Sequence, residues 1–276
     1  MVAGLLFCEY NNGAMKLTVI LPVRNQTDKL LKNLKESIIP YFDKTGVVYN
    51  ILIESDGSNE EEQKKLEEGV KSLPLQVTMV PFENKKGKGY AVKRAILLST
   101  GDYVLFMDAD LSTDLHAFDK ILPDINKYDS FIASRHNKDS DITEKQTLVR
   151  RLTSWGSRFL IRNMFRLKGI DDTQCGYKLF RTDIAKLMAK HQKIDGFAFD
   201  VEYVYFLSLN GFSIKEIPVK WANDPDSSVN ALKASINFFK SLQEIKKNKK
   251  SYLLSDEERK SLETAATKRT EETYVN

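Results

Sequence analysis

Two carboxylates, Asp108 and Asp110, stand one residue apart at the end of a mostly apolar run that covers residues 102–107. A run of this kind, opened by Gly101 and closed by acids, is typical of a buried parallel strand. In open α/β sheets, ligands bind in the crevice beyond the carboxyl ends of the strands. Two hard oxygen ligands at that position suit Mg²⁺ or Mn²⁺ carrying a diphosphate. A lone acidic pair is more often a solvated turn, so the surrounding residues must decide between the two interpretations.

Polar residues also end two earlier apolar runs. Residues 17–21 lead into Arg24 and Asn25, and residues 49–53 lead into Asp56. An ordinary turn would contain similar residues, because Asp, Asn, Gly and Ser all favour turns. Three such clusters at the carboxyl edge of one sheet nevertheless favour a nucleotide-binding crevice.

Gly87 and Lys88 stand at the predicted start of a helix that runs to Leu98. The stretch lacks the first glycine of a P-loop, and Tyr90 occupies the position of its hydroxyl residue. It also does not follow the first strand, as a dinucleotide-binding fingerprint would. An ATPase and a dinucleotide dehydrogenase are therefore disfavoured. Backbone amides at this helix start can bind the negative charge of a ligand, although a plain loop-to-helix turn explains the glycines equally well.

Strand-like apolar runs alternate with helical periodicity through the first half of the chain. This alternation predicts βαβ units with right-handed crossovers. The fold class is therefore α/β, with a mostly parallel, Rossmann-like sheet flanked by helices. The expected strands cover residues 17–21, 49–53, 75–80, 102–107 and 130–133, and the expected helices begin at Thr27, after Ser58, at Tyr90 and at Asp114 (to Ile125).

The second half of the chain changes character. A long helix is predicted over residues 145–167, with Arg150, Ser154 and Arg158 a turn apart on one side. A solvated basic face explains this spacing as well as a binding site does. Asp200 opens a later helix, where capping alone can explain an acid. Residues 213–221 should form an edge strand, because Pro218 lacks the N–H that a central strand needs.

The carboxyl-terminal part is rich in lysine. Residues 228–245 have helical apolar periodicity, and lysines follow, so this C-terminal amphipathic helix can pack on the core or lie on an anionic bilayer. We expect residues 1–14 to be a leader or loose arm and residues 15–250 a single domain. Residues 251–276 are charged and poor in apolar residues, which predicts a disordered tail.

Composition excludes several classes of protein. The chain has 42 basic and 38 acidic residues and a net charge of +4, without zinc-finger spacing, which argues against a nucleic-acid partner. Two cysteines, Cys8 and Cys175, cannot form a disulfide framework and fit a reducing, cytoplasmic compartment. No run approaches the ~18 apolar residues of a transmembrane helix.

Taken in order, these motifs resemble the polyprenyl-phosphate glycosyltransferases, which are family 2 glycosyltransferases with the GT-A fold. The resemblance runs from about residue 17 to residue 245. The donor-side matches are LPVRN at 21–25, SDGS at 55–58, KGKG at 86–89 and MDADLS at 107–112. The most specific matches, DDTQCGYKLF at 171–180 and FAFDVE at 197–202, are similar to the dolichyl-phosphate glucosyltransferase branch.

The resemblance implies a role for each matched residue. Gln26 and Ser55 replace acids of the family pattern, and both lie at the nucleoside end of the implied donor site. The residues implied for donor binding are Pro22, Arg24, Asn25, Asp56, Gly87, Lys88 and Asp108. The implied metal is Mg²⁺ or Mn²⁺, and its implied ligands are Asp108 and Asp110. The residues implied for binding the acceptor phosphate are Arg135, Arg150 and Ser154, and those implied for catalysis are Asp108, Asp110, Arg135 and Asp172.

The implied reaction is an inverting transfer of a hexose, with glucose favoured, from a nucleoside-diphosphate sugar such as UDP-glucose to a dolichyl or undecaprenyl phosphate. A phosphate nucleophile is already ionised, so it needs positioning more than a general base. Two alternatives stay open. One is a family 2 enzyme that acts on a sugar or protein hydroxyl, with Asp172 or Asp200 as the base. The other is a catalytically silent scaffold of a membrane complex, against which the intact Asp56, Asp110 and Arg135 argue.

A lipid acceptor implies that the protein works at a membrane surface as a peripheral protein. The lysine-rich helix at residues 228–250 is the predicted contact, and the helix over residues 145–167 is a second candidate. A membrane-anchored partner chain or a homo-oligomer is the alternative way to reach the lipid.

Overall fold

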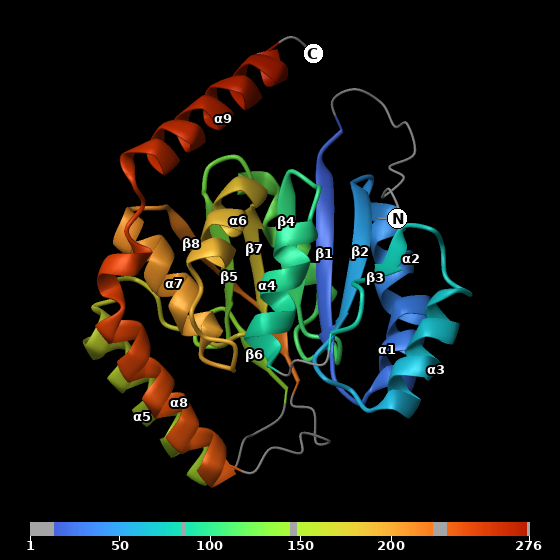
Figure 1. Ribbon diagram of the computed structural model, residues 1–276, viewed down its shortest axis with the longest axis horizontal. Coiled ribbons are helices and arrows are strands. Elements are labelled where there is room, and N and C mark those ends of the chain that lie inside the picture. The colour runs from blue at the N-terminus through green and yellow to red at the C-terminus, as the bar shows by residue number, and fades with distance from the viewer. Residues whose placement is uncertain (1–13, 84–86, 144–147, 223–230, 275–276) are drawn as a thin grey trace.

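A seven-stranded sheet runs through the middle of the molecule, and helices cover both of its faces (Figure 1). The computed structural model describes residues 14–83, 87–143, 148–222 and 231–274, without the side chains at 148–155, 231–235 and 266–274. In spatial order the strands are β3 (Val77–Met79), β2 (Val48–Ser55), β1 (Lys16–Val23), β4 (Tyr103–Met107), β7 (Tyr177–Arg181), β5 (Ser130–Ser134) and β8 (Ile214–Pro218).

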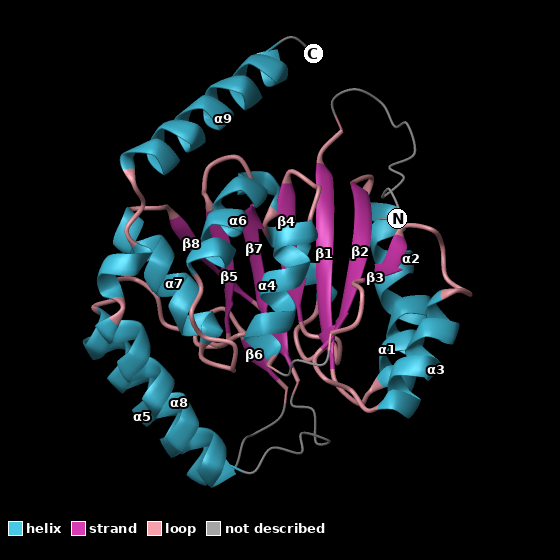
Figure 2. Ribbon diagram, in the orientation of Figure 1, coloured by secondary structure: helices cyan, strands magenta, loops and turns pink. Residues whose placement is uncertain are grey.

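One strand, β7, runs against all the others (Figure 2). It is antiparallel to β4 and β5, whereas β1, β2, β3 and β4 are mutually parallel and β5 is parallel to β8. The reversal means that β7 begins at the edge where its neighbours end, with Tyr177 opposite Met107. The predicted α/β class and mostly parallel sheet are confirmed, and Pro218 lies in the edge strand β8.

Each face of the sheet has its own apolar layer. Helix α4 shows the reason, because Ala91, Val92, Ala95 and Ile96 recur on one side of the helix and are buried against the sheet. The first face carries α1 (Thr27–Asn33), the π-helical η1 (Leu34–Ile38), α2 (Ile39–Thr45), α3 (Glu60–Val70) and the 3₁₀ segments η2 (Leu115–Lys120) and η3 (Leu122–Asp124). The second face carries α4 (Lys88–Leu98), α6 (Thr182–His191) and α7 (Phe199–Asn210).

Two long helices, α5 (Leu148–Phe165) and α8 (Ala231–Lys247), lie side by side outside α7. Helix α7 is buried over residues 199–207, between these two helices and α4 and α6, which explains why it is apolar on nearly every side. On α8, Leu242 and Ile245 are buried, whereas Ile236 and Phe239 are exposed. Among the described residues, no helix is long and apolar enough to cross a bilayer.

The prediction of one α-helix over residues 114–125 is wrong. The structure has the two 3₁₀ segments η2 and η3 instead. The Asp114 carboxylate accepts a hydrogen bond from the His116 amide at 2.9 Å, which closes a tight turn. Pro123 has no N–H with which to continue an α-helical ladder.

The prediction of a disordered tail is also wrong. The short segment η4 (Lys249–Tyr252) and helix α9 (Asp256–Tyr274) follow α8. Three acids at the start of α9 favour the positive end of the helix dipole, and Ala, Glu, Lys and Arg are strong helix formers. Tyr252 and Leu254 are buried in the layer that contains α7, so the domain extends past residue 250. Of the leader or loose arm expected over residues 1–14, residues 1–13 lie outside the described residues.

Candidate active site

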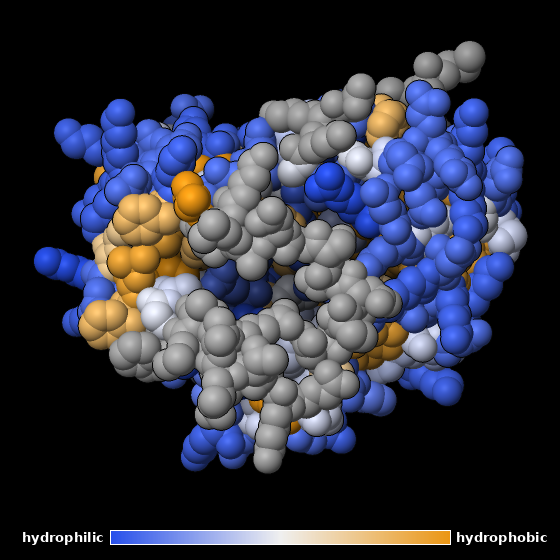
Figure 3. Space-filling view, turned by 90° about the horizontal axis from the view of Figure 1, so that it is seen from below, coloured by the Kyte–Doolittle hydropathy of each residue, from blue (hydrophilic) through white to orange (hydrophobic). Residues whose placement is uncertain are grey.

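The carboxyl edge of the sheet brings the candidate residues together from distant parts of the chain. Strand β2 ends before Asp56, β4 before Asp108, and β5 before Arg135. Because β7 is reversed, the segment that precedes it, with Gly176, reaches this same edge. Figure 3 looks onto this edge and shows a hollow with hydrophilic side chains in its visible floor.

Asp108 is held from two sides. Its Oδ1 pairs with Lys88 Nζ at 2.6 Å, and its backbone N–H donates to the Gly176 carbonyl at 2.9 Å. A Cβ atom on Gly176 would lie 1.9 Å from Asp108 Oδ2, so only glycine leaves room for the carboxylate. Burial opposes the charge of Lys88, but Asp108 and Asp200 outweigh it and raise the lysine pKa. Lys88 therefore joins the glycine-rich helix start to the acidic pair as a permanent cation.

Asp110 stabilises the turn that follows the acidic pair. Its Oδ1 accepts the Ser112 amide at 2.9 Å, and Leu111 between them adopts a left-handed conformation with φ 57°. Such a φ is uncommon for a non-glycine residue and costs energy that the surroundings must supply. Part of that support is the Asn33 side-chain amide, which donates to the Ala109 carbonyl at 2.9 Å.

The carboxylate of Asp110 fits a divalent cation that is shared with a substrate. Within the described part of the chain, no group of three or more His, Cys, Asp or Glu side chains is arranged to hold a metal. A cation at Asp110 would therefore complete its coordination with substrate oxygens and water. This is how Mg²⁺ is usually held by proteins that act on diphosphates. Asp108, by contrast, already has Lys88 as its partner.

Asp56 connects the second strand to the glycine-rich helix start. Its Oδ1 accepts the Gly87 amide, and its side chain is buried. Burial raises the Asp56 pKa, while the Gly87 N–H, Arg24 and Lys88 act in the opposite direction. Gly87 has φ 141°, a conformation that side chains rarely adopt.

The donor-site residues predicted at the end of β1 differ in their exposure to solvent and in their contacts. Pro22 is buried inside β1, whereas Arg24 is exposed. Asn25 adopts φ 51°, and its Oδ1 accepts the Asn59 amide at 3.0 Å. Its own amide donates to Ser58 Oγ at 3.0 Å. Asn25 thus holds the loops after β1 and β2 together, which is a structural role in addition to the predicted nucleoside contact.

Arg135 and Asp172, which sequence analysis assigned separate roles, form one buried ion pair. Arg135 Nε and Nη2 bind the two carboxylate oxygens at 2.7 and 2.9 Å, and the Arg135 amide donates to Oδ2 at 3.0 Å. Burial opposes ionisation of Asp172, but Arg135 outweighs it and lowers the pKa to about 2. The guanidinium also lies 5.6 Å from the centre of the Trp221 ring. Among the described residues, none pairs with Arg135 Nη1.

A second buried ion pair lies beneath Asp108. Lys178, the second residue of β7, is fully buried and pairs with Asp200, and it also donates to the Cys175 carbonyl. Asp200 lies in the first turn of α7, where the helix dipole favours an acid, and the ion pair with Lys178 gives it a second role. The Lys178 ammonium lies 5.8 Å from the centre of the Phe106 ring. This pair fixes the loop before β7.

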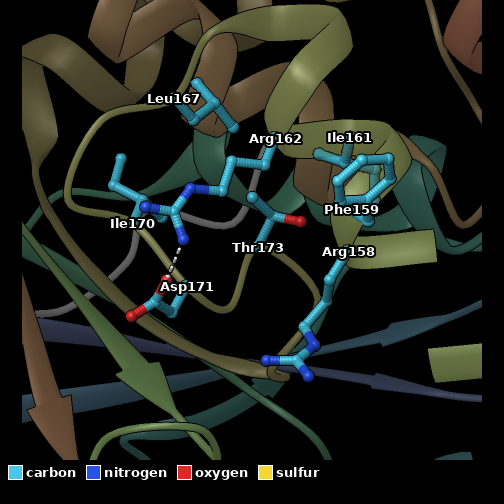
Figure 4. A pocket seen from close by; sticks show the side chains of 8 residues that line it. All are labelled: Arg158, Phe159, Ile161, Arg162, Leu167, Ile170, Asp171 and Thr173. Carbon is cyan, nitrogen blue, oxygen red and sulfur yellow. Dashed lines mark hydrogen bonds and ion pairs between the residues drawn. The ribbon is translucent and has the colours of Figure 1, made fainter. Parts of the chain in front are cut away.

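The predicted acceptor residues on α5 are only partly described. Arg150 and Ser154 belong to the first turns of α5, and their side chains lie outside the described residues. Further along, Arg158 and Arg162 border a pocket of about 140 Å³ (Figure 4). Arg162 pairs with Asp171 at 3.0 Å, whereas the Arg158 Nε is buried without a hydrogen-bond partner in the described structure. The rest of the lining is largely apolar, namely Phe159, Ile161, Leu167 and Ile170 with Thr173.

Sequence analysis missed several residues that shape this site. Lys178 had a usable signal, because a lysine inside an apolar central strand requires a buried partner. Gly176 and Trp221 had none, since their neighbours come from parts of the chain far away in sequence. Glu216 likewise became visible only in the structure, where one carboxylate oxygen accepts the amides of Asp171 and Asp172 at 2.8 Å each.

Solved structures with the same fold support a class assignment. Glucosyl-3-phosphoglycerate synthase from Mycobacterium tuberculosis, solved with Mn²⁺, UDP-glucose and phosphoglyceric acid, is 15% identical with a TM-score of 0.62, over 84% of this chain and 80% of that one. Mannosyl-3-phosphoglycerate synthase from Rubrobacter xylanophilus is 16% identical with a TM-score of 0.59, over 83% and 73%. These likenesses show that the fold is of the GT-A class.

The family model described as glycosyl transferase family 2 matches residues 18–188. The chain therefore belongs to glycosyl transferase family 2. Relatives named dolichyl-phosphate beta-glucosyltransferase are 31% identical in Dictyostelium discoideum (83% of this chain, 73% of the relative), 29% in Saccharomyces cerevisiae (78% and 69%) and 27% in Homo sapiens (77% and 69%). The expected resemblance to this family and this branch is confirmed.

Proposed function

We propose that the protein transfers glucose from UDP-glucose to a polyprenyl phosphate such as dolichyl phosphate. The observation that carries the proposal is the meeting of the acidic pair with the glycine-rich helix start, in a chain whose relatives are named dolichyl-phosphate beta-glucosyltransferase. In-line attack on an α-linked donor inverts the anomeric carbon and gives a β-linked product. The linkage in the names of these relatives agrees with that outcome.

A phosphate acceptor fits the carboxylates of the site better than a hydroxyl acceptor does. A hydroxyl would need a general base. Asp172 is a weak base, because Arg135 pairs with it and its pKa is about 2. Asp200 is buried and paired with Lys178. A lipid phosphate is ionised at neutral pH, so this site needs only to position it.

In the proposed reaction, an oxygen of the lipid phosphate attacks the anomeric carbon, and the bond from that carbon to the diphosphate oxygen breaks. Lys88 and the amides at the start of α4 hold the donor diphosphate, which leaves as UDP. A divalent cation at Asp110 supplies stabilisation of the charge that develops on this leaving group. On the acceptor side, Arg135 offers Nη1, and Arg158 adds its positive charge on the same helix as the proposed Arg150 and Ser154.

UDP-glucose is expected to stabilise the folded protein in the presence of Mn²⁺, because a ligand that binds only the native state stabilises it by mass action. At a concentration of about 100 Kd, the gain is about 2.7 kcal/mol. The measurement is a thermal melt with UDP-glucose, and with GDP-mannose as the control, followed by transfer to polyprenyl phosphate. A shift with GDP-mannose but not with UDP-glucose would show that the proposed donor is wrong.

The proposed lipid acceptor requires contact with a membrane surface that faces the cytoplasm. Three aromatic and aliphatic side chains of the neighbouring helices α5 and α8 are exposed, namely Phe159, Ile236 and Phe239. Exposed lysines stand at the end of α8 and just after it, at Lys247, Lys249 and Lys250. Figure 3 shows an apolar patch on the side of the molecule where α5 and α8 lie. We propose this face, defined by these six residues, as the membrane-docking face.

The protein is expected to float with anionic liposomes at low salt and to be released at high salt, because charge attraction is screened over about 10 Å at 0.1 M. Replacing Phe159 and Phe239 with serine should lower the bound fraction at least ~10-fold, since each buried phenylalanine contributes about 1.5–3 kcal/mol. Leu75→Ser is the matched control, because Leu75 is 93% exposed elsewhere on the surface. Equal flotation of all three proteins would point to a membrane-anchored partner chain or an oligomer.

A further inference from the structure

Glu202 is a buried carboxylate that the proposed chemistry does not use. It is only 1% exposed, and its oxygens accept three hydrogen bonds. Two come from the backbone amides of Lys193 and Ile194, at 2.6 and 3.0 Å, and the third from the Tyr252 hydroxyl at 2.7 Å. Glu202 therefore fixes the conformation of the loop over residues 192–196, which we call the support loop.

The support loop lies directly against the start of α4. The Asp195 carbonyl accepts the Tyr90 amide at 3.1 Å, and the Gln192 side chain donates to the Gly89 carbonyl at 2.9 Å. The backbones touch, because a Cβ atom on Gly87 would lie 2.3 Å from the Asp195 carbonyl oxygen. A similar atom on Gly89 would lie 2.7 Å from the carbonyl oxygen of Ile194. A shift of the support loop must therefore move the start of α4.

The start of α4 is part of the proposed donor site. Gly87 donates its amide to Asp56, and Lys88 pairs with Asp108. A series of contacts thus runs from Glu202 through the support loop and the start of α4 to the carboxylates of Asp56 and Asp108. Two of the intermediate steps rely on a long side chain, namely the Gln192 hydrogen bond to Gly89 and the Lys88 ion pair, and the others are contacts of the backbone.

The carboxyl-terminal segment contributes the hydrogen bond from Tyr252 to Glu202 at the start of this series of contacts. Tyr252 is fully buried, and its carbonyl accepts the Asn210 side-chain amide at 2.8 Å. The Leu254 amide donates to Asn210 Oδ1 at 3.0 Å, which fixes the segment on the end of α7. Glu202 and Tyr252 both lie beyond residues 18–188, the part of the chain that matches the family model.

We propose that Glu202 and Tyr252 are positioning residues for the donor diphosphate. They act through the support loop on the amides at the start of α4, so that the carboxyl-terminal segment controls the donor affinity of the site. This inference rests on the proposed function for the identity of the donor. The mechanical coupling itself does not depend on that identity.

The test compares Tyr252→Phe with Tyr205→Phe. Each variant loses one hydroxyl from the same apolar layer, where the two rings lie 6.2 Å apart. The Tyr205 hydroxyl makes no hydrogen bond to the residues that the structure describes, so its loss is the matched control. Hydrogen exchange at the amides of residues 87–91 and the UDP affinity with Mn²⁺ are then measured for both variants and for the wild-type protein.

In Tyr252→Phe, these amides are expected to exchange about tenfold faster and the Kd for UDP to rise about fivefold, since a hydrogen bond to a charged group is lost. The KM for UDP-glucose should rise to a similar extent, while kcat at saturating donor and the KM for polyprenyl phosphate stay unchanged. Tyr205→Phe should match the wild-type protein in all of these. A role in stability alone would lower the melting temperature without this selective effect on the donor.

Equal amide exchange and equal UDP affinity in the two variants would overturn the inference. If the wild-type protein does not bind UDP, the proposed donor is wrong, and the exchange comparison still decides the coupling. Glu202→Gln provides the stronger perturbation, because its amide nitrogen cannot accept one of the backbone N–H groups. Its exchange at residues 87–91 should exceed that of Tyr252→Phe, and a smaller effect would also contradict the proposal.

Discussion

Replacing Asp110 with asparagine is expected to lower the rate of glucosyl transfer at least ~10³-fold, which corresponds to about 4 kcal/mol of lost transition-state stabilisation. The reason is electrostatic, because the variant loses the charge that would hold a divalent cation against the leaving diphosphate. The fold should survive, since an asparagine oxygen can still accept the Ser112 amide that now lies 2.9 Å from Oδ1. The transfer rate across a Mn²⁺ titration checks the expected loss of activity, and thermal melts check that the fold survives.

Asp114→Asn is the control for this experiment. It removes one negative charge from the same loop, and asparagine keeps the turn that Asp114 now closes with the His116 amide. Activity of the wild-type protein should also disappear on chelation and return with Mn²⁺. If Asp110→Asn retains near-normal activity at any Mn²⁺ concentration, the proposed metal role of Asp110 is wrong.

The part of the site that follows parallel strands was predictable from local sequence. Apolar runs that end in polar residues predict Asp56, Asp108 and Asp110 at one sheet edge, where the structure has them. The prediction is possible because a buried strand and its end can both be recognised from the types of a few consecutive residues. Gly87 and Lys88 were predictable in the same way, since a helix start after glycine is a local feature.

The pairing of these residues was not predictable. Sequence analysis treated Arg135 as an acceptor ligand and Asp172 as a base, yet each is the other's partner. Lys178 and Asp200 likewise form one buried pair, although each was considered by itself. Such pairs depend on the direction of β7, and a short apolar strand has the same pattern whichever way it runs.

The reversed strand also explains why Gly176 was missed as a site residue. It is 68 positions from Asp108 in the chain, and only the register of β4 with β7 brings the two together. Glycine in a loop before a strand usually indicates a turn. Here it has no positive φ, and its role is to leave space for a carboxylate.

Gly176→Ala is therefore expected to lower kcat/KM for glucosyl transfer at least ~10²-fold, equivalent to about 2.7 kcal/mol. The added methyl group would lie 1.9 Å from Asp108 Oδ2 and 2.3 Å from its Cγ. The backbone cannot easily yield, because Asp108 donates its amide to the Gly176 carbonyl and Met107 pairs with Tyr177. The carboxylate must turn away, which breaks its contact with Lys88. Overpacking of this kind should also cost about 1–3 kcal/mol of stability, measured by urea unfolding.

Gly156→Ala is the matched control, since its methyl group enters open space within α5 and should raise stability by about 0.5–1 kcal/mol. A double-mutant cycle then separates the clash from general disruption of the fold. In the Asp108→Ala background the carboxylate is absent, so Gly176→Ala should destabilise the protein by at least ~1 kcal/mol less than it does in the wild-type background. Equal destabilisation in both backgrounds would mean that the methyl group meets something other than Asp108. Wild-type activity in Gly176→Ala would show that the observed position of Asp108 is not required for transfer.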